Sequence, residues 1–328
     1  MKILYIYRHP DMGYSIGKVF RSIENEMRKY AEVDSVYLPV PNYSVKGLWE
    51  NIKYALSQSK KKKYDIIHIT GTEHYLLPFL RNERVIITIH DLGFYTNNRS
   101  NYKNILKYFL WIKTLPLANH VTFISEKSKC ETLRLVKLNE EKCSIVLNPV
   151  SSEFSPHPKV INKFCPVILH IGTGNNKNLA TTAIALYDFP CKLRIVGKLT
   201  EGQKMILDLY NIHYECVSNL TDDEILQEYI NCDVVNFPSL YEGFGMPIIE
   251  GQAIGRPILT SNISPTREIA GDSAVLVEPT NTDSIRHGYE ILLKNADEYI
   301  KKGLENVKRY ALSRISQEYF QIYKNVVK

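Results

Sequence analysis

The feature that most constrains this fold is an alternation of short apolar runs with longer segments of helical spacing. The runs are continuous in Val, Ile and Leu, which indicates strands covered on both faces, as in parallel α/β sheets. Six runs lie in the first half, at 2–7, 35–40, 66–70, 85–90, 121–125 and 144–147. Six more lie at 167–172, 193–196, 214–217, 234–238, 257–260 and 274–277. We therefore predict an α/β protein with two parallel sheets.

A segment rich in proline and serine, 148–158, separates the two groups and is typical of a linker. The chain has 328 residues, which suits two domains of about 150 residues. Each group is large enough for one Rossmann-like domain. We predict one such domain over 1–150 and another over 151–310, with their sheets facing across a cleft.

The end of the chain has apolar residues at helical spacing: Ile315, Tyr319, Ile322 and Val326. This spacing predicts a final helix within 311–328. We expect it to pack back on the first domain.

Composition excludes several classes of protein. Hydrophobic residues make up 44% and charged residues 23%, and no apolar run approaches the roughly 20 residues of a membrane span. A net charge of +6 is too mild for nucleic-acid binding. The six cysteines form no CxxC pair, so neither zinc nor disulfides are indicated. The first apolar run is too short for a signal peptide, and we expect a cytoplasmic protein.

The segment 238–250, PSLYEGFGMPIIE, follows a predicted buried strand. Gly243 and Gly245 permit a tight loop, and Pro247 suits the first position of a helix. Amide groups at such a helix start bind phosphate well, and Glu250 in the first turn could accept hydrogen bonds from a ribose.

Glu242 and Glu250, in this context, resemble the E-x7-E signature of retaining GT-B glycosyltransferases of the family 4 type. That family assembles bacterial polysaccharides and glycolipids such as lipopolysaccharide. The resemblance implies transfer of a hexose-type sugar from a UDP- or GDP-linked donor to a glycan or lipid-linked glycan. It is tight in the second domain and looser in the first.

The resemblance also implies roles for individual residues. The catalytic residues would be Glu242, His90 and Lys177. The donor-binding residues would be Glu250, Gly243, Phe244, Gly245, Met246, Ser218, Asn219, Leu220, Ser239, Thr173, Gly17 and Ser15. Lys177 matches the phosphate-binding lysine, whereas Thr173 stands where the family often has an arginine.

Each assignment has a structural alternative. Lys177 could be a solvated loop residue, and His90, at a predicted strand end, could simply bond to backbone. Residues 218–220 could precede a capped helix, because Thr221 and Glu224 form a capping-box pattern. His68 more plausibly supports the core than performs chemistry.

No Asp-x-Asp triplet occurs, so we expect no metal cofactor and a diphosphate neutralised by cations and helix amides. The family mechanism is front-face attack with retention, in which the leaving phosphate helps to deprotonate the acceptor. Alternatives are a GT-B nucleotide-sugar epimerase or a catalytically silent nucleotide-sugar-binding subunit. A dehydrogenase is disfavoured because no GxGxxG follows the first strand.

Two segments suggest peripheral contact with an anionic membrane at its inner face. Residues 60–63 are four lysines, and 99–113 mix basic with aromatic residues. A solvated helix end is the stronger explanation of the lysines, whereas for 99–113 helix packing against the first domain explains the pattern as well as membrane contact does.

Overall fold

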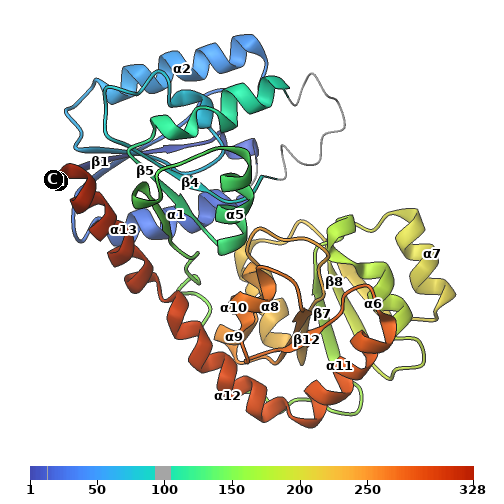
Figure 1. Ribbon diagram of the computed structural model, residues 1–328. Helices are drawn as coiled ribbons and strands as arrows, with labels where there is room; N and C mark the ends of the chain where they lie inside the picture. The colour runs from blue at the N-terminus through green and yellow to red at the C-terminus, as the bar shows by residue number, and fades with distance from the viewer. Residues whose placement is uncertain (13, 93–104) are drawn as a thin grey trace. The chain divides into compact units, whose positions relative to one another are not determined.

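The computed structural model describes every residue except 13 and 93–104, and the side chains of 14 and 15 are also outside the description. The chain divides into two compact units (Figure 1). Unit 1 comprises Met1–Pro149 and Leu312–Lys328, and unit 2 comprises Val150–Ala311. The predicted boundaries lay at 150/151 and 310/311, within one residue of these.

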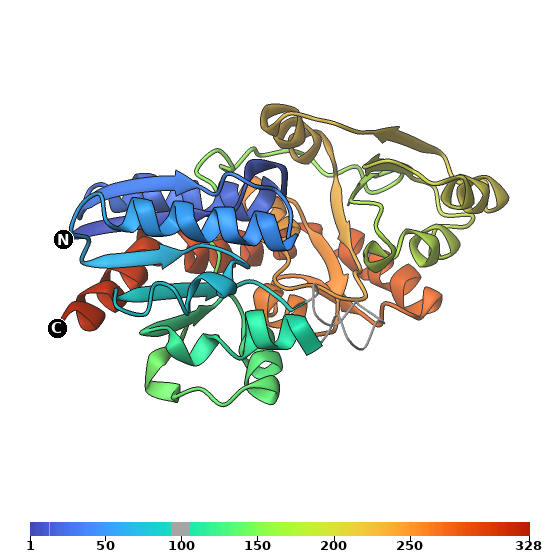
Figure 2. The same ribbon diagram turned by 90° about the horizontal axis from the view of Figure 1, so that it is seen from above.

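Unit 1 contains a six-stranded sheet in the order β2-β1-β3-β4-β5-β6. Its strands are β1 Lys2–Tyr7, β2 Glu32–Tyr37, β3 Ile66–Ile69, β4 Val85–Ile89, β5 His120–Phe123 and β6 Cys143–Ile145. All of the pairings are parallel, and Figure 2 shows the strands side by side. β3 and β4 are buried along their whole length, as the continuous apolar runs predicted.

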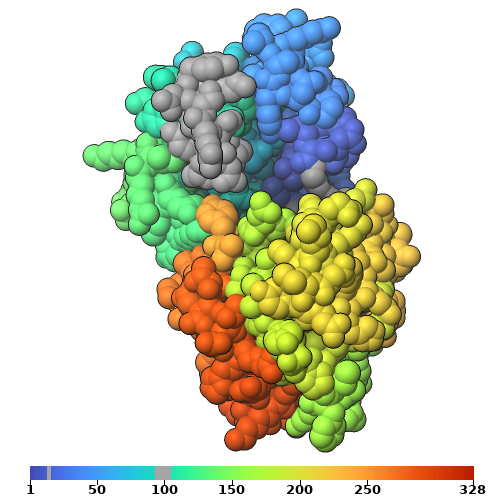
Figure 3. Space-filling view, turned by 90° about the vertical axis from the view of Figure 1, so that its right-hand side faces the viewer, coloured from blue at the N-terminus to red at the C-terminus, as the bar shows by residue number. Residues whose placement is uncertain are grey.

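The helices of unit 1 cover this sheet. They are α1 Tyr14–Met27, α2 Val45–Ser59, α5 Glu126–Leu135 and α13 Leu312–Val327, with short turns η1 Pro10–Met12, η2 His74–Leu76, η3 Tyr108–Ile112, η4 Leu115–Leu117 and η5 Glu140–Lys142. α2 begins with a Ser44 side-chain cap and lies on the surface of unit 1 (Figure 3, blue). α13 packs against α1, although α13 begins about 285 residues after the end of α1 in the sequence (Figure 1).

A buried polar network fixes α13 to the sheet. The Tyr323 hydroxyl lies 2.9 Å from the Tyr5 hydroxyl and 2.6 Å from Nδ1 of His68. Nε2 of His68 in turn lies 2.8 Å from Oγ1 of Thr88. His68 is therefore a core residue, as predicted, and burial lowers its pKa to about 3.

Unit 2 contains a second six-stranded parallel sheet, in the order β12-β11-β10-β7-β8-β9. Its strands are β7 Val167–Ile171, β8 Lys192–Val196, β9 Tyr214–Val217, β10 Val234–Phe237, β11 Ile258–Ser261 and β12 Val275–Val277. The prediction of two parallel α/β sheets is confirmed. Strand ends differ from the predicted ones by up to three residues. The largest difference is at β2, where Glu32, Val33 and Asp34 pair with β1 ahead of the predicted start at 35.

The helices of unit 2 are α6 Leu179–Ala185, α7 Glu201–Leu209, α8 Asp222–Asn231, α9 Met246–Ile254, α10 Thr266–Ala270, α11 Thr282–Lys294 and α12 Ala296–Asn306, with turns η6 Asn175–Lys177 and η7 Val307–Tyr310. The capping box of Thr221 and Glu224 is present at the start of α8, as predicted. In the described part of the chain, every helix is too short or too polar to cross a membrane.

Candidate active site

The strand order of unit 2 indicates where a ligand binds. From β7 the chain first moves outward through β8 and β9 and then returns to β10 on the other side of β7. In open α/β sheets, ligands bind outside the carboxyl ends of the strands at such a reversal. The segments that leave β7 and β10 carry Lys177 and Glu242, so the topology brings these residues to one edge.

Lys177 and Glu242 form an ion pair. Nζ of Lys177 lies 2.5 Å from Oε1 of Glu242, and both side chains are largely buried. The ammonium also lies 4.8 Å from the centre of the Phe237 ring. The sequence analysis named both residues but did not predict that they form a pair. The pair forms because β7 and β10 are neighbours in the sheet, and no local sequence pattern reveals the order of strands.

Asn176 ties the loop after β7 to the loop after β10. The side-chain amide of Asn176 donates to the backbone carbonyl of Tyr241 at 3.1 Å. The backbone carbonyl of Asn176 accepts from the N–H of Leu240 at 2.8 Å. These bonds hold Glu242 beside Lys177. Asn176, which replaces the residue usual before the lysine, is therefore a positioning residue for this edge.

Thr173 has a structural function in place of the family's arginine. Its hydroxyl donates to the carbonyl of Lys198 at 2.7 Å, and its carbonyl accepts from the Gln203 amide at 2.7 Å. The side chain thus joins the loops that follow β7 and β8. Gly172, with φ of 90°, makes room for the stem of Lys177, whose Cγ would lie 3.1 Å from a Cβ at 172.

The loop after β10 leads into α9 at Gly245, whose φ of 123° requires glycine. Met246 is the first helical residue, so the prediction that Pro247 comes first is wrong by one position. Glu250 is consequently the fifth residue of α9, in the second turn and not the first. Its Oε2 accepts a 2.6 Å hydrogen bond from the buried hydroxyl of Tyr229, which fixes the carboxylate.

The remaining predicted donor-binding residues of unit 2 differ in exposure. Ser218 and Asn219 are exposed before α8, with Asn219 at φ of 58°, and Leu220 is half-buried. The Phe244 ring is buried against Tyr310, so only its backbone is available to a ligand. Ser239 is fully buried, and its hydroxyl has no hydrogen-bond partner among the described residues.

The predicted residues of unit 1 lie at the carboxyl edge of the first sheet or on α1. Gly17 is in α1, and the side chain of Ser15 lies outside the described residues. His90 follows β4 and is 5% exposed. Its Nε2 is 2.9 Å from the carbonyl of Thr70, which only accepts, so Nε2 carries the proton and Nδ1 has a lone pair. Burial lowers the pKa of His90 to about 4, so the ring is neutral at pH 7.

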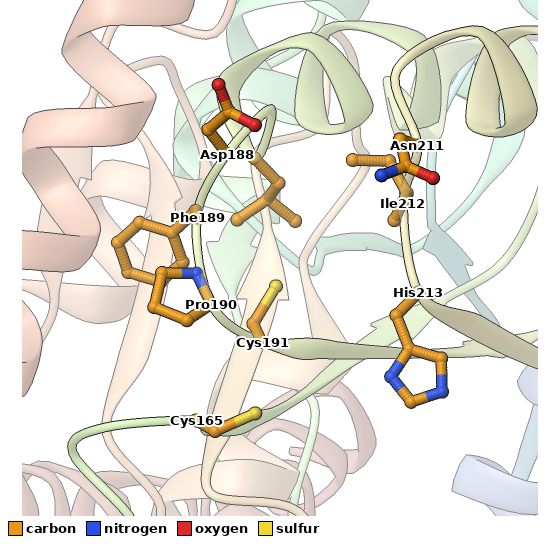
Figure 4. A pocket seen from close by; sticks show the side chains of 9 residues that line it. Cys165, Asp188, Phe189, Pro190, Cys191, Asn211, Ile212 and His213 are labelled. Atoms are coloured by element: carbon orange, nitrogen blue, oxygen red, sulfur yellow. The ribbon is translucent and has the colours of Figure 1, made fainter.

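The cavity drawn in Figure 4 lies at the opposite edge of the second sheet. It has a volume of about 510 Å³, and Cys165, Cys191 and His213, which precede β7, β8 and β9, are among its lining residues. Figure 4 shows Cys191 between Phe189 and Ile212. None of the predicted site residues lines this cavity. We therefore do not assign this cavity as the candidate active site, despite its volume.

The described residues contain no group of three or more His, Cys, Asp and Glu side chains that could hold a metal. Of the segments predicted to contact a membrane, 60–63 follow the end of α2, where Lys62 pairs with Asp34 at 2.8 Å. Residues 99–104 lie outside the described residues. In the remainder, Ile105, Leu106 and Phe109 are exposed and Trp111 is buried. Membrane contact stays a prediction, which co-sedimentation with anionic vesicles would check.

Two family descriptions match the chain. Residues 151–312 match "Glycosyl transferases group 1", and residues 18–154 match "Glycosyltransferase Family 4". Among curated proteins, O-antigen chain mannosyltransferase B of Escherichia coli is 24% identical over 76% of this chain and 72% of its own. O-antigen chain mannosyltransferase RfbU of Salmonella typhimurium is 23% identical over 82% of this chain and 77% of its own.

Solved structures resemble the whole chain. Sucrose-phosphate synthase of Thermosynechococcus elongatus superposes with a TM-score of 0.81 at 18% identity, covering 99% of this chain and 98% of its own. HepE of Anabaena, solved with UDP and glucose, gives 0.75 at 14% identity, covering 99% and 100%. WaaG, a glycosyltransferase involved in lipopolysaccharide biosynthesis, gives 0.73 at 11% identity, covering 98% and 99%. At these identities the likeness establishes a shared fold.

Proposed function

The chain belongs to the family 4-type glycosyltransferases of the GT-B fold, and from this we propose that it transfers a hexose-type sugar from a nucleotide-sugar with retention of configuration. The donor is linked to UDP or GDP, and the acceptor is a glycan or lipid-linked glycan of the lipopolysaccharide type. The two curated relatives named as O-antigen mannosyltransferases support this acceptor class and a hexose donor.

The observation that carries the proposal is the Lys177–Glu242 ion pair at the edge where the strand order of unit 2 reverses, with Glu250 in α9, the helix that follows the loop of Glu242. Lys177 provides a cation for the diphosphate, and the amide groups at the start of α9 add partial positive charge. Glu250, held by Tyr229, is suited to accept hydrogen bonds from a ribose. A structural neighbour that was solved with UDP and glucose supports a nucleotide-sugar as the donor.

In this proposal, Lys177 is paired with Glu242 before the donor binds and contacts the diphosphate afterwards. The 2.5 Å contact with Glu242 holds the ammonium in place, so little side-chain entropy is lost when a phosphate arrives. Phosphate binding then shares the cation, and the carboxylate of Glu242 orients the transferred sugar. Stabilisation of the leaving diphosphate without a metal is the expected consequence.

His90 contributes as a neutral group. With its proton on Nε2, its Nδ1 can accept a hydrogen bond from a sugar hydroxyl but cannot donate one. It therefore positions a hydroxyl and does not serve as a general acid. The departing phosphate oxygen takes the acceptor proton in the front-face mechanism that we propose.

The test is a thermal-shift screen of UDP- and GDP-sugars, followed by product analysis with the stabilising donor. We expect one nucleotide class to raise Tm for the wild type, and Lys177→Ala and Glu250→Ala to lose most of that shift. Lys198→Ala is the matched control for charge, because its side chain is exposed in a neighbouring loop of unit 2 and should leave the shift intact.

Glu250→Gln separates ligand binding from folding, because it retains an acceptor for the Tyr229 hydroxyl. The site assignment is wrong if no nucleotide stabilises the wild type, or if Lys177→Ala and Glu250→Ala respond like Lys198→Ala. Epimerised donor without transfer, or nucleotide binding without turnover over a panel of acceptors, would instead point to the alternative functions.

A further inference from the structure

A row of polar side chains crosses the interior of unit 2 next to the candidate active site. His170 in β7 and Asn236 in β10 are directly opposed in the two neighbouring strands. His170 is 1% exposed, and Asn236, Thr182 in α6 and Tyr289 in α11 are fully buried. His170 also lies two residues before Gly172, in the chain that leads into the loop of Lys177. Buried polar groups are almost always hydrogen-bonded, so the partner of each one can be asked for.

The hydrogen bonds in this row fix the orientation of the Asn236 side chain. The Tyr289 hydroxyl donates to Oδ1 of Asn236 at 2.7 Å. The amide nitrogen Nδ2 of Asn236 lies 2.8 Å from Nδ1 of His170 and 3.2 Å from Oγ1 of Thr182. Because an amide nitrogen only donates, Nδ1 of His170 is the acceptor and carries no proton.

The proton of the His170 ring is therefore on Nε2. Burial lowers the pKa of His170 to about 4, so the ring is neutral at pH 7 and carries a single proton. Nε2 is buried and has no hydrogen-bond partner among the described residues. The row thus ends in a buried N–H donor that its own network orients but does not satisfy.

The His170 ring lies close to the loop that carries Lys177. After burial, the charge of Lys177 lowers the pKa of His170 further, and the backbone of Gly172 raises it, although no well-formed hydrogen bond joins Gly172 to Nε2. A Cβ at position 172 would lie 3.1 Å from Cγ of Lys177, so the Lys177 side chain rests against this glycine. A group that holds the backbone of Gly172 therefore also sets the position of the Lys177 ammonium.

We propose that His170 is a positioning residue for the donor: with the diphosphate bound, its Nε2–H donates to the backbone of Gly172 and so holds the Lys177 ammonium against the phosphate. The inference rests on the proposed function, since it concerns how the Lys177 loop holds that donor. Asn236 and Tyr289 act through His170 by keeping its proton on Nε2. Because this hydrogen bond is made only in the bound state, it favours binding.

The experiment compares two variants that each retain one end of the imidazole. His170→Asn keeps an acceptor for the Asn236 amide near Nδ1 and lacks the donor, whereas His170→Gln places an amide N–H near the Nε2 position. Calorimetric titration of the full chain with UDP and with GDP measures Kd. We expect His170→Asn to weaken binding about three- to tenfold, as the loss of one net hydrogen bond does, and His170→Gln to recover most of the loss.

Nitrogen-15 NMR of the histidine rings supplies a readout that needs no nucleotide. The ring signals that disappear in His170→Asn should show a proton on Nε2 and none on Nδ1, unchanged between pH 6 and 8. Tyr289→Phe removes the hydroxyl that orients Asn236, so we expect part of the His170 population to carry its proton on Nδ1 and Kd to rise. His213→Asn is the matched control, at an exposed histidine before β9, and should leave Kd unchanged.

Folding of each variant is checked by circular dichroism. The proposal is overturned if folded His170→Asn binds as the wild type does, or if His170→Gln loses as much affinity as His170→Asn. A His170 ring that carries its proton on Nδ1 in the wild type would also overturn it, whether or not the variants fold. A purely structural row would lower Tm in the variants and leave Kd unchanged.

Failure of this inference can be told apart from failure of the proposed function. If neither UDP nor GDP binds the wild type, the proposed function fails, and the donor role of His170 fails with it. If a nucleotide binds the wild type and folded His170→Asn equally well, the proposed function stands and only the positioning role is wrong.

Discussion

At the scale of single residues, burial decides what each ionisable group can do. Glu73 and Glu242 are both glutamates that follow strands. Glu73 is buried and its Oε2 has no hydrogen-bond partner among the described residues, whereas Glu242 is paired with Lys177. Burial lowers the pKa of His68 to about 3 and those of His90 and His170 to about 4. These histidines are therefore neutral, and they act as hydrogen-bonding groups.

Glu73 predicts a pH dependence of stability. Its pKa is raised on folding from 4.5 to about 7, so the folded state binds more protons between these values. Protonation of Glu73 therefore stabilises the folded state fully below pH 4.5, and this stabilisation is lost as pH rises through 7. At about 1.4 kcal/mol per unit, the loss is about 3 kcal/mol.

Urea unfolding at pH 5 and pH 8 checks this prediction. Glu73→Gln should be more stable than the wild type at pH 8 and should lose the pH dependence. Glu141→Gln, at an exposed glutamate, is the control and should follow the wild type. An unchanged pH dependence in Glu73→Gln would show that this carboxyl is ionised in the folded state throughout.

At the scale of elements, the loops after β7 and β10 act as one piece. Asn176 joins their backbones, and Thr173 joins the first of them to the loop after β8. Glycine is required at position 172 because the methylene groups of the Lys177 side chain lie against the place where a Cβ would be. The position of the ammonium is therefore set by backbone conformation as much as by its ion pair.

Gly172→Ala tests this arrangement. A side chain at φ of 90° is strained, and its Cβ would press on Lys177 at 3.1 Å, so we expect a loss of about 1–3 kcal/mol in unfolding free energy. We also expect weaker nucleotide binding, measured by thermal shift. Gly202→Ala is the matched control: a Cβ there meets nothing within 4 Å, and alanine in α7 should be neutral or stabilising. Equal effects of the two changes would contradict this account of Gly172.

At the scale of the whole molecule, the chain returns at its end to the unit in which it began. α13 belongs to unit 1, and Tyr323 places its hydroxyl between Tyr5 and His68 inside that unit. The last residues therefore complete the core of the first domain, and its stability depends on both ends of the chain.

Tyr323→Phe should destabilise unit 1 by about 1–3 kcal/mol, because it leaves the buried hydroxyl of Tyr5 and the Nδ1 of His68 without this partner. Calorimetry should show an earlier transition for unit 1 and an unchanged one for unit 2. Tyr187→Phe, at an exposed tyrosine of unit 2, should alter neither transition. A Tyr323→Phe protein with wild-type melting would mean that the network contributes no net stability.

Much of the fold could be predicted because its signals are local. Apolar runs indicated each strand of both sheets to within three residues, least accurately at β2, which begins with Glu32, and the proline- and serine-rich segment marked the passage between the units. The glycines around Glu242 indicated the loop before α9. The position of Pro247 was missed by one residue because a helix start depends on the dihedral angles of Gly245, which the sequence does not specify.

The sequence alone determined the parallel α/β architecture, because strand period and loop composition act over a few neighbouring residues. The roles of Glu242, Glu250 and Lys177 were implied by a family resemblance and stay a prediction. Only the tertiary structure decided that Lys177 pairs with Glu242, that Thr173 bonds to backbone, and that Glu73 is buried. These features depend on strand order and on burial, which arise from contacts between segments that are distant in sequence.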